Sequence, residues 1–124
     1  MSELWKLTAL EASDLLKKKE ISPLEMVDSC AERIDATEDG LNAIPTRCYD
    51  RARDHARRLM DDSNHAYEGP GALHGLPIAV KELEDVAGVR TTYGAPLWKD
   101  HVPERSDIMV ERLEERGGIV MGKS

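Results

Sequence analysis

Two short, uninterrupted apolar runs, Leu76–Val80 and Gly118–Met121, lie in the second half of the 124-residue sequence. Runs of this length without polar alternation are typical of strands that are buried on both faces. We predict strands at about residues 76–81 and 118–122, flanking a helix at about 107–116 that Ser106 caps and Gly117 ends. A strand, a crossover containing a helix and a second strand form a βαβ-type unit, so we expect the two strands to pair in parallel.

The first half of the sequence predicts three helices, at about residues 8–19, 23–38 and 48–60. Thr8 and Ser22 each precede a glutamate by three residues, which is the capping-box pattern. Gly40 lies past the expected end of the second helix, and residues 42–45 are expected to be extended because they precede or include a proline. Aspartates alternate with the arginines of the third helix, which predicts a solvated face whose charges pair with one another.

The predicted sheet is incomplete. Two buried strands cannot form a sheet that is covered on both faces, because their outer edges need neighbouring strands. The sequence ends just after the second apolar run. We therefore expect an α/β fold whose sheet is interrupted.

The charge and cysteine content exclude several classes of protein. The 24 acidic residues outnumber the 17 basic ones, which argues against a nucleic-acid partner or an anionic membrane surface. No apolar run reaches the roughly 18 residues that a membrane span needs, and the N-terminus lacks the pattern of a signal peptide. Cys30 and Cys48 form neither a disulfide framework nor a zinc motif. We therefore expect a soluble domain in the reducing cytoplasm.

Lys81 is the best candidate for a residue that carries chemistry. It follows four apolar residues at the carboxyl end of a predicted strand, which is where open α/β sheets bind their ligands. Partial desolvation there would disfavour the charged amine and allow the lysine to act as a base. The alternative is an ion pair at the strand end with Glu82, Glu84 or Asp85, and the residues alone leave both possibilities open.

Other chemical motifs are weaker. Residues 117–124 match the phosphate-loop pattern G-x-x-x-x-G-K-S, but the spacer is the second apolar run and no helix follows, so we reject this interpretation. The histidines are spaced too widely for a local metal motif and are expected to be solvated. They are His55, His65, His74 and His101. Both cysteines are expected to pack inside the protein.

Several segments, taken in order, resemble the amidase signature family. Residues 75–82, Gly-Leu-Pro-Ile-Ala-Val-Lys-Glu, are similar to its G-I/L-P-I/V-x-V/L-K-D/E segment, and residues 86–94 are similar to the V-x-G-x-x-T-T-x-G segment that follows. Residues 106–124 resemble its A/S-D-x-x-x-V-x-R-L-x-x-x-G-A/G-x-x-x-G-K-T/S segment. The two leading helices and Leu41-Asn42-Ala43 also fit. The resemblance covers nearly the whole chain and is therefore specific.

The resemblance implies an α/β/α sandwich around a large mixed sheet, with residues 1–124 as the N-terminal part of the domain. It implies hydrolysis of a carboxamide C–N bond by a serine nucleophile, a serine in a cis peptide and a lysine, whose position matches Lys81. No metal or organic cofactor is implied. In the family both serines lie downstream of the G-K-T/S segment, in a glycine- and serine-rich stretch. None of the serines in this sequence lies in such a stretch.

Two hypotheses follow. In the first, the chain is an N-terminal fragment of an amidase: the product of a truncation or a frameshift, or a piece of a longer chain. It is then inactive alone and associates with the missing remainder to act on a small-molecule amide. In the second, it is a non-catalytic binding or assembly module derived from an amidase, such as a homo-oligomer. The loop at residues 94–103, with Tyr93 and Trp98, could line one wall of a site, although surface packing is favoured.

Overall fold

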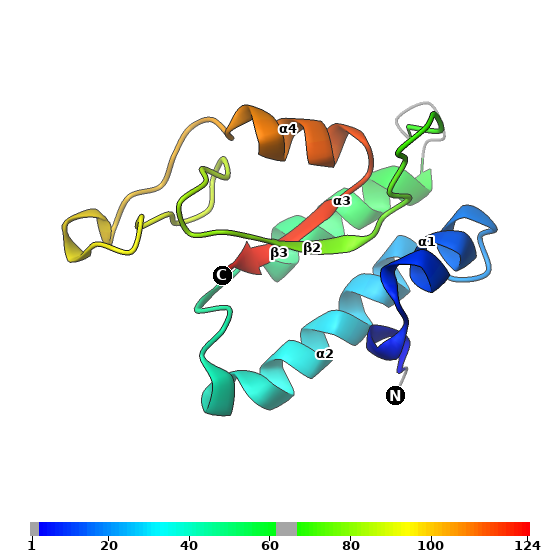
Figure 1. Cartoon of the computed structure of the whole chain (residues 1–124), viewed down its shortest axis with the longest axis horizontal. Coiled ribbons are helices and arrows are strands. Elements are labelled where there is room, and N and C mark those ends of the chain that lie inside the picture. Colours follow the sequence, from blue (N-terminus) through cyan, green and yellow to red (C-terminus); the bar gives the residue numbers. More distant parts are fainter. Residues whose placement is uncertain (1–2, 62–66) are drawn as a thin grey trace.

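The computed structural model describes residues 3–61 and 67–124 as a mixed α/β arrangement (Figure 1). Within them are four α-helices: α1 (Ala9–Lys17), α2 (Pro23–Leu41), α3 (Tyr49–Asp61) and α4 (Ile108–Glu115). The strands are β1 (Thr46–Arg47), β2 (Pro77–Val80) and β3 (Ile119–Lys123), and the 3₁₀ helices are η1 (Leu4–Lys6) and η3 (Pro96–Trp98). The expected α/β class with an incomplete sheet is confirmed. No helix of the described residues has both the length and the apolar character that crossing a membrane requires.

The strands form a sheet in the order β1-β3-β2. β2 pairs with β3 in parallel, as predicted from the βαβ pattern, and β1 pairs with β3 antiparallel. The sequence did not predict β1, whose two residues are too few to give a periodic pattern. Its close approach depends on Gly122, because a Cβ atom there would lie 2.4 Å from the carbonyl oxygen of Thr46.

β3 is buried along its whole length and supplies both faces of the core. Ile119 and Met121 face α2 and α3, whereas Val120 faces α4, as expected for the two-residue period of a strand. In Figure 1, α2 and α4 accordingly lie on opposite sides of the strands. A third cluster joins α1 to α2 through Ala12, Leu16 and Met26.

The prediction that both strands are buried on both faces is wrong for β2. Ala79 is exposed and Ile78 is half-buried, while Val80 is buried. The reason is that β2 lies at one edge of the sheet, so that it lacks the neighbour on one side that a central strand has among the described strands. An apolar run indicates a strand that suits a buried position. It does not indicate whether the strands or helices that would bury it are present.

The helix starts follow the sequence closely, but one helix end does not. The capping boxes predicted at Thr8 and Ser22 are both present. The second helix, however, runs through Gly40 to Leu41, and Asn42 ends it in the left-handed conformation with φ 50°. The buried carboxylate of Glu38 stabilises this end, since it accepts hydrogen bonds from the backbone amides of residues 43 and 44.

The start of α4 also differs from the prediction. Asp107, and not Ser106, occupies the N-cap position. The Ser106 hydroxyl accepts a hydrogen bond from the Ala87 amide at 2.9 Å, and the Asp107 carboxylate accepts one from the Asp85 amide at 2.7 Å. Both side chains therefore hold the segment after β2 against the start of α4. Gly117, with φ 92°, follows the helix as predicted.

The arginines of α3 connect helices more than they pair within their own helix. Arg51 forms a two-point ion pair with Glu114 of α4, and the Arg53 guanidinium donates to Asp28 of α2 at 2.8 Å. The pair of Arg57 with Asp54 lies within α3, as expected. The predicted self-paired face is thus wrong for Arg51, whose partner lies in α4, and holds in part for Arg53, which also pairs with Asp50 of α3 at 3.9 Å.

Candidate active site

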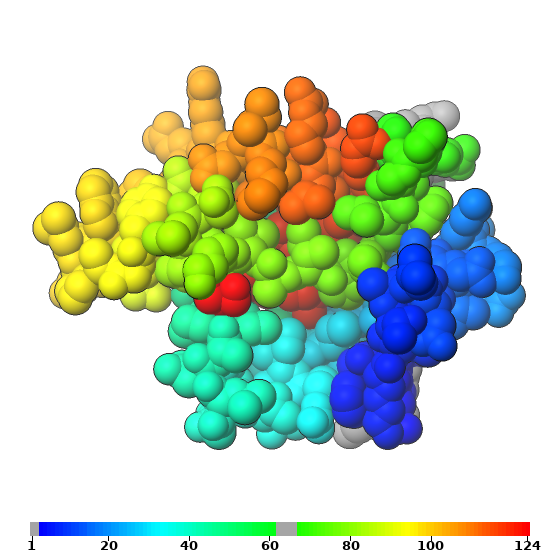
Figure 2. Space-filling model, viewed as in Figure 1, coloured from blue at the N-terminus to red at the C-terminus, as the bar shows by residue number. Residues whose placement is uncertain are grey.

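The carboxyl ends of β2 and β3 lie side by side and define the candidate site. Val80 is the register partner of Lys123. The Ser124 amide donates to the Val80 carbonyl at 2.9 Å, and the Glu82 amide donates to the Ser124 carbonyl at 2.8 Å. Lys81 therefore lies beside Ser124 at the end of the sheet. Figure 2 shows the C-terminal end (red) at the surface there, between the light green segment around β2 and the turquoise segment after α2.

Lys81 is exposed in this structure. The partial desolvation expected for Lys81 is therefore absent. The alternative, an ion pair with a neighbouring carboxylate, is absent among the described residues as well. Glu82 instead binds Thr92, and Asp85 binds Tyr93. The structure thus leaves the Lys81 amine accessible at the surface.

A tight turn follows Lys81, in which the Glu84 amide donates to the Lys81 carbonyl at 2.9 Å. One carboxylate oxygen of Glu82 accepts hydrogen bonds from the Thr92 amide at 2.6 Å and from its hydroxyl at 2.9 Å. The second oxygen is buried and has no hydrogen-bond partner among the described residues. The side chain of Glu82 therefore points back into the protein, away from the solvent around Lys81.

Lys123 is a charged residue of this region that the sequence analysis left without a role. It is completely buried, and its ammonium donates to the Glu84 carbonyl and, at 3.0 Å, to the Thr91 hydroxyl. Burial lowers the pKa of Lys123, while the nearby carboxylate of Glu82 favours the charged form. The sequence signal for Lys123 was a lysine close to the end of a fully apolar run, residues 118–121. Within the phosphate-loop pattern at residues 117–124, Ile119–Lys123 form the strand β3 and not a loop, which agrees with the rejection of that motif.

The aromatic side chains after β2 pack on one another. The Tyr93 ring lies edge-on to Trp98 with centroids 5.7 Å apart, and the Tyr93 hydroxyl donates to Asp85 at 2.5 Å. This hydrogen bond to a carboxylate raises the pKa of Tyr93 to about 12. His101 completes the cluster, with its ring 5.3 Å from that of Trp98. This arrangement agrees with the surface packing favoured from the sequence.

The remaining histidines and the cysteines differ in burial. His55 is buried and not solvated as expected, since its ring lies on α3 with Nδ1 3.9 Å from the Glu114 carboxylate of α4, and burial lowers its pKa. His74 is half-buried, and His65 lies outside the described residues. The Cys48 thiol packs as expected, and burial raises its pKa to about 11. In residues 3–61 and 67–124, no three His, Cys, Asp or Glu side chains gather as a metal ion requires.

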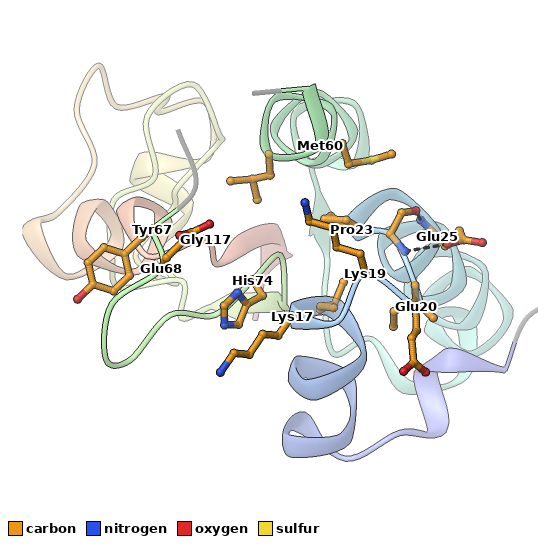
Figure 3. Close-up of a pocket in the computed structure, with 14 residues that line it drawn as sticks. Lys17, Lys19, Glu20, Pro23, Glu25, Met60, Tyr67, Glu68, His74 and Gly117 are labelled. Atoms are coloured by element: carbon orange, nitrogen blue, oxygen red, sulfur yellow. Dashed lines mark hydrogen bonds between the residues drawn. The ribbon is translucent and has the colours of Figure 1, made fainter. Parts of the chain in front are cut away.

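A cavity of about 610 Å³ lies elsewhere, between the α1–α2 turn, the end of α3 and the loop before β2 (Figure 3). Lys17, Lys19 and His74 are among the side chains around it. Lys81 is not one of its lining residues. The cavity is therefore separate from the candidate active site at the end of the sheet.

Comparisons with known proteins match this chain and its fold to one family. The model of the family described as Amidase matches residues 25–124. The chain is 38% identical to a subunit of glutamyl-tRNA(Gln) amidotransferase from Halothermothrix orenii, over 98% of this chain and 24% of that protein. It is 35% identical to an amidase from Pseudomonas putida, over 100% of this chain and 26% of that protein.

Solved structures agree. A bacterial aryl acylamidase of the amidase signature family superimposes with a TM-score of 0.80 at 27% identity, over 94% of this chain and 24% of that one. Fatty acid amide hydrolase gives a TM-score of 0.85 at 21% identity, over 99% of this chain and 22% of that one, which shows the shared fold. The chain belongs to the amidase signature family. It spans about a quarter of the length of the curated relatives it matches.

Proposed function

We propose that residues 1–124 supply the N-terminal part of an amidase signature domain that hydrolyses a carboxamide C–N bond. Lys81 is the proposed catalytic lysine of this reaction. The observation that carries the proposal is the position of Lys81: it lies in the segment 75–82 that resembles the family's lysine segment, and it follows β2 at the end where β3 also ends.

In the proposed reaction, a neutral Lys81 accepts a proton through a serine in a cis peptide, which activates a second serine as the nucleophile. The serine oxygen attacks the amide carbon, the amine leaves with a proton, and water hydrolyses the acyl-enzyme to the acid. Both serines belong to a glycine- and serine-rich stretch that this sequence does not contain. The isolated chain is therefore expected to be inactive.

The exposure of Lys81 fits this proposal. A lysine becomes neutral near pH 7 when burial disfavours its charged form, so an exposed amine needs further polypeptide to cover it. Large apolar side chains of the same half of the chain are also exposed. They are Leu83, Leu97, Val102, Ile108 and Met109. We propose that the remainder of an amidase domain associates with this surface and with the open edge of β2.

A hybrid enzyme tests the catalytic role. In the Pseudomonas putida amidase, the region that this chain matches is replaced by residues 1–124, and hydrolysis of that amidase's substrate is measured. We expect Lys81→Met to lower kcat by about 10²–10⁴-fold, the range for losing a general acid–base group. Lys99→Met, which removes another exposed lysine, is the control and should retain activity. Full activity of the Lys81→Met hybrid would contradict the proposal, as would turnover by the isolated chain.

The same exposed surface also suits the alternative of a non-catalytic assembly module. Light scattering on the isolated chain separates the two. A stable homodimer that forms no complex with the rest of an amidase favours the module, whereas binding to that remainder favours the amidase fragment.

We also propose a cytoplasmic location for the chain. Cys30 and Cys48 are both free thiols, which fits a reducing compartment. Fractionation of cells that express the full chain tests this: recovery in the cytoplasmic fraction is expected, and recovery outside it would contradict the proposal.

A further inference from the structure

The surroundings of Lys123 are unusual for a lysine that no proposed catalytic step uses. Its side chain is completely buried, and a buried ammonium is costly unless its charge is hydrogen-bonded or paired. Two acceptors satisfy it, the backbone carbonyl of Glu84 and the hydroxyl of Thr91. The carboxylates that act on it electrostatically come from the segment after β2 and from the N-cap of α4. They are Glu82, Glu84, Asp85 and Asp107.

The first of these contacts acts on the turn that carries Lys81. The Glu84 amide donates to the Lys81 carbonyl at 2.9 Å, and the Glu84 carbonyl accepts from the Lys123 ammonium. The Glu84 amide therefore closes the turn, and the Glu84 carbonyl attaches the turn to β3 through Lys123. Since β3 is buried throughout, it offers a rigid support for this attachment.

The second contact fixes Thr91, which in turn belongs to the segment that holds Glu82. Thr91 is completely buried, accepts from Lys123 and donates its own hydroxyl to the Val89 carbonyl at 3.0 Å. Its neighbour Thr92 donates both its amide and its hydroxyl to the Glu82 carboxylate. The two threonines thus link Glu82, which lies inside the turn, to Lys123.

We propose that Lys123, acting with Thr91, is a positioning residue that fixes the turn at residues 81–84 and thereby the place of the Lys81 amine. The catalytic meaning of this inference rests on the proposed function of Lys81. The structural part, the fixing of the turn, stands apart from it. Lys123 and the two adjacent threonines thus share one role, which is to fix this turn.

Amide hydrogen exchange on the full chain tests the fixed turn directly. Thr91→Val keeps the shape of the side chain but removes the hydroxyl, whereas Thr91→Ser keeps the hydroxyl. We expect Thr91→Val and Lys123→Met to raise the exchange rate of the Glu84 amide by about tenfold or more, and Thr91→Ser to leave it near the native rate. The Val27 amide in α2 serves as the reference. Unchanged exchange at Glu84, or an equal rise at Val27, would overturn the proposal.

The hybrid enzyme tests the link to catalysis. A misplaced Lys81 affects the chemical step more than substrate binding, so we expect Thr91→Val to lower kcat by about tenfold or more with KM nearly unchanged. Thr91→Ser should restore kcat. Native kcat in Thr91→Val, or an equal loss in Thr91→Ser, would overturn the positioning role. If the native hybrid is inactive, the proposed function fails, and the exchange experiment still decides whether Lys123 fixes the turn.

Discussion

The helical region of residues 9–61 and the connecting segment of residues 82–107 are built in different ways. In the helical region, α2 and α3 pack on β3 through small and branched side chains such as Val27, Ala31 and Ala52, which are 0–2% exposed. The connecting segment contains one short 3₁₀ helix among its described residues and is held by hydrogen bonds that its backbone amides donate to polar side chains. The two regions nevertheless meet at the same strand, β3.

The two regions contribute differently to the stability of the fold and to the geometry of the site. Both regions expose some large apolar side chains, since Leu10 of α1 is 85% exposed and Leu97 of the connecting segment is 86% exposed. The connecting segment adds Val86 and Val89 to the buried cluster around Val120, and hydrogen bonds fix its backbone at further points. We infer that the helices and β3 hold the chain together, and that the connecting segment holds Lys81 in place.

The largest expected effect comes from the strand that both regions share. Ile119→Ala removes a completely buried side chain from β3 and should lower the free energy of unfolding by about 2–4 kcal/mol. Ile108→Ala is the matched control, since Ile108 is 68% exposed, and it should cost less than about 0.5 kcal/mol. Urea denaturation measures both. Similar losses for the two variants would contradict the assigned core.

Two serines sharpen the comparison between the regions. Ser22→Ala removes the cap of α2, and Ser106→Ala removes the acceptor of the Ala87 amide. Each should cost about 1 kcal/mol, but in different places. Hydrogen exchange should show faster exchange at the start of α2 for Ser22→Ala and faster exchange around residue 87 for Ser106→Ala. Loss of protection in both regions in each variant would mean that the regions unfold together.

The pH dependence of stability tests the burial of His55 on α3 beside Glu114 of α4. Burial lowers the pKa of His55, so between its lowered value and the ordinary value the unfolded chain binds more protons than the folded chain. Stability should therefore fall as the pH drops through this window. Urea midpoints at about pH 7.5 and about pH 5.5 measure the fall, and His55→Gln should make it smaller. An unchanged fall in His55→Gln would assign the effect to other groups.

The smallest effect is expected at the surface of α3. Arg57 pairs with Asp54 within the helix, and both side chains are largely exposed. Arg57→Ala should therefore change the free energy of unfolding by less than about 0.5 kcal/mol. Arg51→Ala, which breaks the half-buried pair with Glu114 of α4, should cost more. Thermal unfolding compares the two variants, and equal effects would contradict the difference in burial.

Local patterns predicted local structure well. The capping boxes at Thr8 and Ser22 and the glycine after α4 depend on residues within one helical turn, so the sequence contains all that they need. The parallel pairing of β2 with β3 followed from the general rule for βαβ units.

Features that depend on distant partners were missed. β1 forms because residues 46–47 meet the end of β3, and Ser106 binds the Ala87 amide in place of capping α4. His55 is buried at a place where Glu114 of α4, which is distant in sequence, approaches its ring. The place of Lys81 at the strand end was predicted, but its exposure was not, since exposure depends on what covers β2. Lys123 was missed because its acceptors lie 32 and 39 residues away.

The central claim is that Lys81 belongs to an enclosed amidase site, which further polypeptide completes. Amine-specific labelling with mapping by mass spectrometry compares Lys81 with Lys99 in the isolated chain and in the hybrid enzyme. We predict that both lysines react in the isolated chain, where both are exposed, and that Lys81 alone becomes about tenfold or more less reactive in the hybrid. A Lys81 that reacts equally in both proteins would contradict the claim.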